Sequence, residues 1–542
     1  MPPPSLLASI RVAALALLLA LAAPQPAPAA ELPPRNPWLA DSSYPLGHGT
    51  SAQQDSVPQA GPRGPGRPLA PGEILTAPVG PAHFGAATSG PYPDGRRVHW
   101  SNGLDRIAKI DHESFAILAT YPFPGVHAYT EQEADASIAA FDAGTHGFFA
   151  IWRAFGEARK LRDLSSVYTL LDRDGIYYLG DKQGVITAWG DADPRDPASA
   201  IEKKREIRLP PEVTGLLVGM NLTFDGWLVV ATEHGYLVAI RRDFGELRVA
   251  RLRHSEGAEE KSTGPGYGWI RNGLATDVDG GIYVASQEHL HKLVWKGDRL
   301  STDEADGAWT APYLNGWSHG TGATPSLMGF GAEDRFVVIT DGEPRMNLVL
   351  FWRDAIPADW QALPGAPDRR IAGMLPVDMG DPNLTAIQSE QSVVVADYGA
   401  LVVNNTPRNA PWYLPERAKA LLIGYLGSDP EYQPFGAQKF AWNPRARRLE
   451  VAWVNREVSS PSCVPIASYA SGLAYLIGAR EGHWTLEALD WKTGASAFHY
   501  AIGGQRYDPL FSGTLVDEAG RIHYGTPWGR VRLAPEPTAP EP

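Results

Sequence analysis

Cysteine is almost absent from this sequence, which has one such residue, Cys463, among 542. A single cysteine excludes an intrachain disulfide framework, a zinc ribbon and the C-x-x-C-H attachment site of a haem. No stretch beyond the N-terminal region approaches the roughly 20 apolar residues of a membrane-spanning helix. The net charge of −13 argues against a nucleic-acid partner. The sequence therefore favours a chain with no haem, no nucleic acid and no integral membrane segment.

Residues 1–29 have the features of a secretory signal peptide. Arg11 is the only charged residue before Glu31, an apolar run occupies residues 12–23, and Ala27-Pro28-Ala29 matches an A-x-A cleavage site. The apolar run is too short to span a bilayer. Richness in Ala, Arg and Pro is typical of a bacterial sequence, so we expect an exported protein, periplasmic or extracellular.

Two other segments lack periodicity. Residues 30–71 are rich in Pro, Gly, Ser and Ala, and residues 535–542 are rich in Pro and Glu. Such composition predicts a flexible arm and a Pro-rich tail. The domain that remains is residues 72–534.

A repeat runs through this domain. Each copy has a turn, an apolar strand, a short turn and a second apolar strand, with clear copies at Asp94-Gly95, Asp174-Gly175, Asp225-Gly226 and Gly280-Gly281. Asp-Gly favours a hairpin because both residues accept positive φ. Four antiparallel strands per unit, repeated many times, predict a β-propeller, in which neighbouring blades bury faces that one blade leaves exposed.

The predicted fold class is therefore all-β: a closed β-propeller of about eight four-stranded blades, with seven as the alternative. The repeats place units at about 83–122, 165–210, 214–253, 270–314, 320–365, 384–428, 434–503 and 509–534. The last unit lacks an outer strand, which residues 72–80 would supply. Residues 123–163 predict a short helical insertion, with helices over 131–141 and 148–161. Closed propellers present few free edges, which favours a monomer.

One blade carries a family resemblance. The turn Leu489-Asp490-Trp491-Lys492-Thr493-Gly494 resembles the Leu-Asp-x-x-Thr-Gly turn of quinoprotein-type propellers. The other hairpins are similar to those of gluconolactonase-like and strictosidine-synthase-like propellers. These resemblances imply the fold and leave the activity open.

The resemblances also bear on cofactors. Quinoprotein alcohol dehydrogenases stack pyrroloquinoline quinone (PQQ) on a vicinal disulfide beside calcium; this chain has no Cys-Cys pair, so PQQ is not expected. A gluconolactonase-like site would hold calcium through one carboxylate and two amides, which implies Glu390, Asn221 and Asn272 here.

Polar side chains at the heads of the innermost strands are expected to face a shared central cavity. His319, in a segment of small residues, is the candidate general base. The full set is His319, Glu390 and Lys439 for catalysis, and Asn221, Asn272, Thr321, Thr324 and Gln438 for substrate binding. The alternatives are a turn-capping histidine at His319 and a channel salt bridge at Glu390 and Lys439.

Two classes of function follow. The first is an exported hydrolase or lactonase that acts on a small organic substrate. The second is a non-catalytic propeller that binds a ligand or a protein partner. An oxidoreductase is a weaker third alternative.

Overall fold

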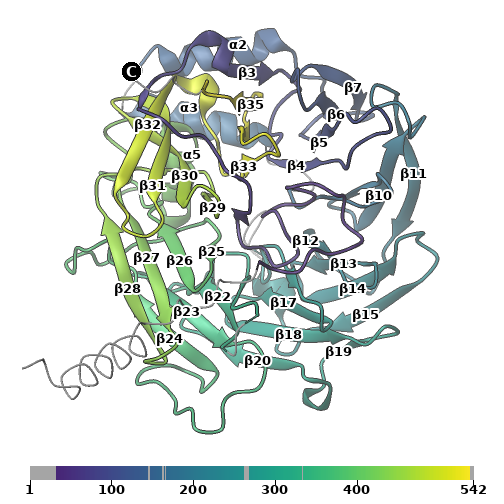
Figure 1. The fold of residues 1–542 in the computed structure, drawn as a ribbon, viewed down its shortest axis with the longest axis vertical. Helices are drawn as coiled ribbons and strands as arrows, with labels where there is room; N and C mark the ends of the chain where they lie inside the picture. Colours follow the sequence, from purple (N-terminus) through teal and green to yellow (C-terminus); the bar gives the residue numbers. More distant parts are fainter. Residues whose placement is uncertain are drawn as a thin grey trace, which may run out of the picture.

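The computed structural model describes residues 32–144, 147–161, 164, 167–261, 268–331 and 334–536. The expected signal peptide and residues 537–542 of the expected tail lie outside the described residues. Strands of the described chain form eight sheets, which are arranged around a common axis (Figure 1). The all-β class and the propeller architecture predicted from the repeats are confirmed in this arrangement.

Four antiparallel strands are the recurring unit. The first four sheets are β4 (Gly85–Thr88), β5 (Val98–Asn102), β6 (Arg106–Asp111), β7 (Ile117–Pro122); β8 (Leu170–Leu171), β9 (Tyr177–Gly180), β10 (Val185–Asp191), β11 (Ile201–Arg208); β12 (Leu217–Leu222), β13 (Trp227–Thr232), β14 (Tyr236–Arg241), β15 (Leu247–Arg251); and β16 (Ala275–Thr276), β17 (Gly281–Ala285), β18 (His289–Trp295), β19 (Leu300–Ser301), β20 (Trp309–Pro312).

The fifth to eighth sheets follow the same plan. They are β21 (Ser326–Met328), β22 (Phe336–Thr340), β23 (Asn347–Trp352), β24 (Ile371–Pro376); β25 (Val394–Ala396), β26 (Gly399–Val403), β27 (Ala437–Asn443), β28 (Arg448–Asn455); β29 (Ile466–Ser468), β30 (Leu473–Arg480), β31 (His483–Asp490), β32 (Ser496–Gly503), joined by β1 (Ser56–Val57) and β2 (Arg67–Pro68); and β33 (Leu515–Val516), β34 (Ile522–Thr526), β35 (Gly529–Leu533), joined by β3 (Ile74–Ala77).

The turn between the first two strands is built around an aspartate in several sheets. In the second sheet, Asp172 Oδ1 accepts hydrogen bonds from the backbone N–H groups of Asp174 and Ile176, and the Tyr178 hydroxyl donates to Oδ2. The same carboxylate turn occurs with Asp277 and Tyr283 in the fourth sheet. Gly175 and Gly280 in these turns have φ values of 76° and 83°, which explains why glycine recurs at the predicted hairpins.

The eighth sheet is completed by the N-terminal part of the chain. β3 pairs antiparallel with β35, with Ile74 opposite Leu533 and Ala77 opposite Arg530. This pairing was expected from the missing outer strand of the last unit. Just before β3, the Glu73 carboxylate accepts hydrogen bonds from Arg67 and from the backbone of Ala70 and Glu536.

The sixth sheet differs from the sequence expectation. Helix α5 (Glu416–Leu426) lies between β26 and β27, the second and third strands of one sheet. The predicted boundary between residues 428 and 434 is therefore wrong, because the helix interrupts the strand repeat inside a sheet. β27 is a third strand and not the inner strand of a new unit.

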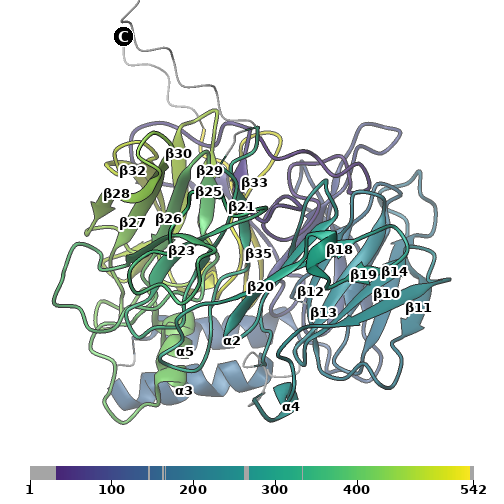
Figure 2. The same cartoon turned by 90° about the horizontal axis from the view of Figure 1, so that it is seen from below.

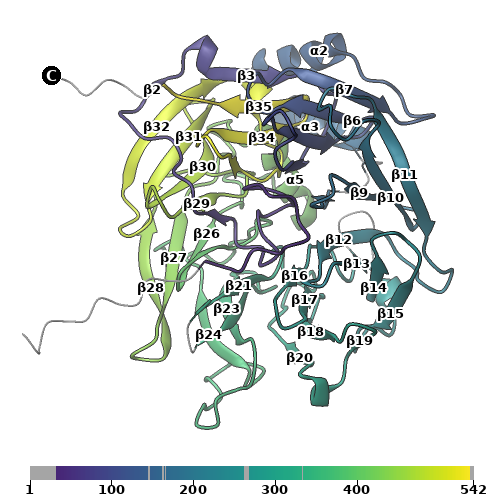
Figure 3. The same cartoon turned by 45° about the vertical axis from the view of Figure 1, so that its right-hand side comes forward.

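Residues 44–57, named here the axial segment, lie inside the ring (Figure 3). Its carbonyl oxygens accept backbone hydrogen bonds from inner strands of six sheets, donated by Thr88, Leu171, Thr276, Leu327, Val395 and Ala467. Most of its side chains are buried. The expectation that residues 30–71 form a flexible arm is wrong for this part, because the inner strands order it through its backbone.

Helices cover one face of the ring. The helices α2 (Glu131–Asp142) and α3 (Gly147–Lys160) match the predicted insertion, and they lie on the same face as α5 (Figure 2). Apolar side chains of all three pack in one cluster with Phe84 and Phe511. Within the described chain, no helix has the length and apolar character needed to cross a membrane.

Replacing Glu73 by Gln tests how the N-terminal chain holds the eighth sheet. Hydrogen bonding to Arg67 lowers the pKa of Glu73 from 4.5 to about 2. The carboxylate thus stabilises the fold above pH 4.5, and that stabilisation is lost as the pH falls towards 2. At pH 7 we expect Glu73→Gln to lower the free energy of unfolding by roughly 1–3 kcal/mol, with the deficit shrinking below pH 4.5.

Denaturant titrations at several pH values measure this difference. Glu202→Gln is the control, since the Glu202 side chain is 54% exposed and its ion pair in the described chain is with Lys204, two residues away. Its change should stay within roughly 0.5 kcal/mol. Equal effects of the two substitutions would contradict the assignment.

Candidate active site

A buried histidine–carboxylate pair lies in the axial segment. His48 Nδ1 is 2.8 Å from Asp55 Oδ2, and the side chains are 10% and 0% exposed. The backbone between them folds into a tight loop, in which the Asp55 N–H donates to the His48 carbonyl at 3.2 Å. His48 and Asp55 have φ values of 62° and 51°, in the left-handed region that L residues avoid. Such strain persists only where surrounding structure over-determines it, and it clusters at functional sites.

His48 lines a cavity of about 90 Å³ on the ring axis. The cavity wall also includes Tyr44, Tyr168, Glu390, Ser392 and Ser512, which come from the axial segment and from chain that precedes inner strands. Because Nδ1 of His48 is bonded to Asp55, Nε2 is the ring nitrogen that remains for a ligand. Phe84 and Phe511 also line the cavity, and both pack against the helix cluster.

Burial controls the ionisation of the groups around His48. It raises the pKa of the Asp55 carboxyl, and the neighbouring His48 opposes that rise. Burial, followed by the charge of Asp55, raises the pKa of Tyr44 above its ordinary value. Tyr44 therefore keeps its proton at neutral pH. The Tyr44 oxygen accepts a hydrogen bond from the backbone N–H of His48 at 3.1 Å. The Tyr44 hydroxyl hydrogen can therefore be donated to a ligand.

An ion pair adjoins this cavity. Arg271 Nη2 lies 3.3 Å from Glu390 Oε2, with side chains 8% and 33% exposed. Arg271 Nε and Asn272 Nδ2 both donate to the Thr321 carbonyl, at 3.1 and 3.0 Å. The Glu390 backbone is fixed in turn by Asn405, whose Oδ1 accepts its N–H at 3.0 Å. Glu390 therefore brings a carboxylate to the cavity, and both the ion pair with Arg271 and the backbone hydrogen bond to Asn405 fix its position.

Threonine hydroxyls connect the wall residues. Thr324 Oγ1 lies 3.3 Å from the Tyr168 hydroxyl and accepts the Gly273 N–H at 3.1 Å. The Thr324 N–H donates to Ser392 Oγ at 3.1 Å. This network joins chain from the second, fourth, fifth and sixth sheets.

A larger pocket of about 550 Å³ lies beside α2 and α3. Its charged residues have structural roles: Glu133 caps α2 with Thr130, and Lys160 pairs with Glu157 at 2.7 Å. The larger volume favours this pocket as the ligand site, whereas the buried histidine–carboxylate pair favours the axial cavity. We assign the candidate active site to the axial cavity because it holds the buried His48–Asp55 pair.

Comparison with known proteins places the chain in a family. No family model matches the sequence. A protein of Archaeoglobus fulgidus, described as uncharacterized, is 33% identical over 520 residues, which cover 94% of this chain and 90% of that protein. The chain belongs to the family of this archaeal protein.

Solved structures with similar folds include alcohol dehydrogenases. A quinohemoprotein alcohol dehydrogenase from Pseudomonas putida HK5 superposes with a TM-score of 0.51 and 11% identity, over 94% of this chain and 82% of that one. A quinohemoprotein alcohol dehydrogenase from Comamonas testosteroni gives a TM-score of 0.48 and 12% identity over the same shares. At such identity the first likeness shows the β-propeller fold alone, as the recognised repeat predicted.

Members of the predicted site separate in the structure. Glu390 lines the axial cavity, and Asn272, Thr321 and Thr324 belong to the network beside it. Asn221 does not join them: its Nδ2 donates to the Ser51 and Leu274 carbonyls, and its Oδ1 accepts the Leu222 N–H. The structure thus does not assemble the calcium set of Glu390, Asn221 and Asn272.

Gln438 and Lys439 lie on β27, so their expected position at an inner strand is wrong. Gln438 Oε1 accepts the N–H groups of Asp378 and Met379. Lys439 Nζ donates to the Trp491 carbonyl at 2.6 Å, and burial lowers its pKa to about 8. The cause of the misplacement is α5, which separates these residues from the first half of their sheet.

His319 lies in a half-buried turn outside the cavity lining. The residues from Gly316 to Gly320 satisfy the G-x-S-x-G spacing, and Ser318 has a φ of 57°. A nucleophile elbow places its serine between a strand and a helix. Here β20 precedes the turn, and the next element in the described chain is strand β21. Its context therefore differs from that of a nucleophile elbow.

Sequence reasoning missed His48 and Asp55. Both lie in a segment whose composition indicated flexibility. The available signal was small: a histidine and an aspartate in a Gly- and Gln-containing stretch with no hydrophobic period.

Asn221→Ala tests the attachment of the axial segment. The substitution removes the amide that joins the Ser51 and Leu274 carbonyls, so we expect a loss of roughly 1–3 kcal/mol in the free energy of unfolding. Faster proteolysis within residues 44–57 should accompany it. Asn383→Ala, at an exposed loop position, serves as control. Unchanged stability and proteolysis in Asn221→Ala would refute this role.

Proposed function

We propose that this protein is an exported, eight-bladed propeller enzyme that hydrolyses a small ester or lactone at the axial cavity. The observation that carries the proposal is the buried Asp55 carboxylate on Nδ1 of His48, which leaves Nε2 as a base at the cavity. A carboxylate in this position fixes the imidazole tautomer and stabilises the imidazolium that forms when the base takes a proton.

The residues define a balanced reaction. His48 Nε2 takes a proton from a water molecule, and the water oxygen attacks the substrate carbonyl carbon. Tyr44 donates its hydroxyl hydrogen bond to the carbonyl oxygen as that oxygen gains negative charge. When the tetrahedral intermediate collapses, the C–O bond to the leaving group breaks, and His48 returns its proton to the alkoxide. The products are a carboxylic acid and an alcohol, which for a lactone are the two ends of one hydroxy acid.

Cavity size limits the substrate. A cavity of about 90 Å³ is smaller than the roughly 150 Å³ that accommodates benzene in a protein core. The reacting acyl group must therefore have only a few non-hydrogen atoms, or be the end of a longer molecule that enters past Glu390.

The oxidoreductase alternative has less support. The name of the Pseudomonas putida dehydrogenase implies a bound quinone, and a cavity of about 90 Å³ is smaller than one that accommodates even a single six-membered ring such as benzene. Residues 44–57 also occupy the inside of the ring, where they bind the inner strands. Export is supported by the pattern of residues 1–29, and ring closure by the pairing of β3 with β35.

Purified mature protein tests the proposal with p-nitrophenyl acetate and methyl acetate as substrates, whose acetyl group is small enough for the cavity. We expect turnover, and a decrease in kcat/KM of roughly 100-fold or more in His48→Gln, since general-base catalysis contributes 10²–10⁴. Asp55→Asn should lower kcat/KM by at least about tenfold, because an amide beside Nδ1 favours the wrong imidazole tautomer.

His483→Gln is the matched control, because His483 is exposed at the start of β31, the third strand of the seventh sheet. It should keep the native kcat/KM. Thermal midpoints of all variants confirm folding. Binding of either compound without turnover would favour the non-catalytic alternative and overturn the enzyme proposal, as would native activity in His48→Gln.

A further inference from the structure

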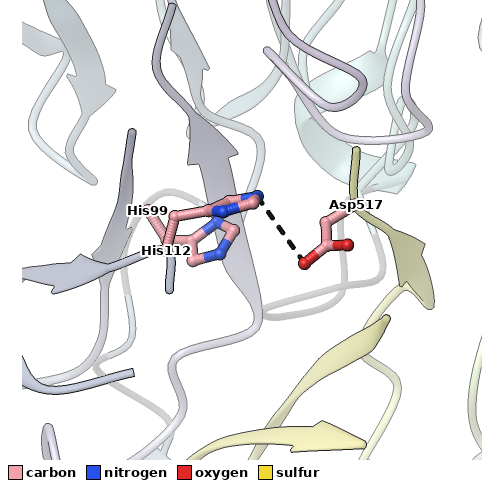
Figure 4. Close-up of side chains that lie close together, drawn as sticks. All are labelled: His99, His112 and Asp517. Carbon is pink, nitrogen blue, oxygen red and sulfur yellow. Dashed lines mark ion pairs between the residues drawn. The ribbon is translucent and has the colours of Figure 1, made fainter. Parts of the chain in front are cut away.

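A second histidine cluster lies where the first and eighth sheets meet, away from the axial cavity lining. His99 is on β5, His112 follows β6, and Asp517 begins the turn between β33 and β34. Ligand atoms of the three residues lie within 4.8 Å of one another, and Figure 4 shows the imidazoles facing the carboxylate. The residues are 2%, 3% and 0% exposed.

The outer nitrogens of both imidazoles are engaged. His99 Nδ1 lies 2.9 Å from Thr88 Oγ1, which leaves Nε2 buried and without a hydrogen-bond partner in the described chain. His112 Nδ1 lies 2.8 Å from Glu113 Oε1, and Arg521 Nη2 also approaches it at 2.8 Å. Metal-binding histidines are oriented in this way, with the nitrogen away from the ion held by a carboxylate or hydroxyl.

The inner nitrogen of His112 faces the Asp517 carboxylate. His112 Nε2 lies 3.6 Å from Asp517 Oδ2, which also accepts a hydrogen bond from Arg521 Nε at 2.7 Å. Zinc–ligand distances near 2.0–2.1 Å give a tetrahedral edge of about 3.3 Å. The His112–Asp517 separation is close to this spacing, and the unpartnered His99 Nε2 supplies the third donor.

The repeated aspartate turn explains only part of this cluster. As in the second and fourth sheets, Asp517 Oδ1 accepts two backbone N–H groups, here from Ala519 and Arg521. His523 takes the place of the tyrosine and lies 2.7 Å from Asp517 Oδ2. Asp277 and Tyr283 make the same turn, and no metal-type cluster forms around them in the described chain. The turn alone thus accounts for Asp517 and His523 and not for His99 and His112.

We infer that His99, His112 and Asp517 bind one divalent transition-metal ion of the zinc type. Two imidazoles and one carboxylate suit such an ion. The three residues are at most 3% exposed, so the ion would be structural. It would link His99 and His112 of the first sheet to Asp517 of the eighth, and would hold the first sheet to the last.

Metal content is the first measurement. Native protein is stripped with EDTA, dialysed and titrated with Zn²⁺ by calorimetry and elemental analysis. We expect about one tightly bound ion per chain, and a thermal midpoint that rises by roughly 5 °C on adding Zn²⁺. With Co²⁺ in place of Zn²⁺, visible d–d absorption should report a tetrahedral nitrogen and oxygen site, which requires no variant.

His99→Ala removes a ligand that has no other hydrogen-bond partner on the inner side, so it should abolish the Co²⁺ spectrum and weaken Zn²⁺ binding by about 100-fold or more. His291→Gln is the matched control: His291 is 1% exposed, with both nitrogens near hydroxyls of Thr310 and Ser286. It should bind metal as the native protein does.

Stripped protein that binds neither Zn²⁺ nor Co²⁺ would overturn the inference and leave the cluster as an ion-pair network. Native affinity in His99→Ala would overturn it too. If His99→Ala does not fold, His112→Gln and the native Co²⁺ spectrum decide.

Discussion

The inner strand of each sheet presents an edge whose backbone groups need hydrogen-bond partners, and the rest of this structure depends on how they are satisfied. Buried N–H groups are rarely left unpaired, because each costs free energy comparable to a lost hydrogen bond. Here the carbonyls of the axial segment accept backbone N–H groups from six sheets, among them Thr88 at 2.7 Å and Leu327 at 2.9 Å. The segment is therefore ordered by the edges it covers, and it carries His48 and Asp55 to the axis. A strained loop is tolerated there because its two ends are held by different sheets, at Pro45 by the second sheet and at Asp55 by the seventh.

Much of the fold could be predicted from the sequence, because hairpin turns leave a local signal. The glycine-containing turns located the strands of the first four sheets, and residues 131–142 and 147–160 form the two helices near the predicted positions. The sixth sheet could not be predicted in full, since α5 lies between its second and third strands and resembles a boundary between units. That single insertion moved Gln438 and Lys439 from a third strand to a supposed inner strand.

The site was less predictable for a physical reason. Glu390, Thr321 and Thr324 precede inner strands, so their position followed from the repeat. His48 and Asp55 belong to a segment that is ordered by hydrogen bonds to its backbone carbonyls. Every residue type has such a carbonyl, so the amino-acid composition does not indicate these bonds. His99, His112 and Asp517 come together only because the last sheet lies beside the first, so no spacing in the sequence relates them. Tertiary closure, and not local pattern, determines both histidine groups.

The two histidine groups differ in what their free nitrogens face, and this separates their chemistry. His48 has a carboxylate on one side and a cavity on the other, which suits proton transfer. His99 and His112 share a buried cluster with the Asp517 carboxylate, which suits a resident ion. One short path joins them: the Ser43 N–H donates to Glu518 Oε1 at 2.7 Å, and Thr88 contacts both the Tyr44 carbonyl and His99. An ion that fixes His99, and His112 beside Glu518, would therefore also fix the start of the axial segment, four residues before the base.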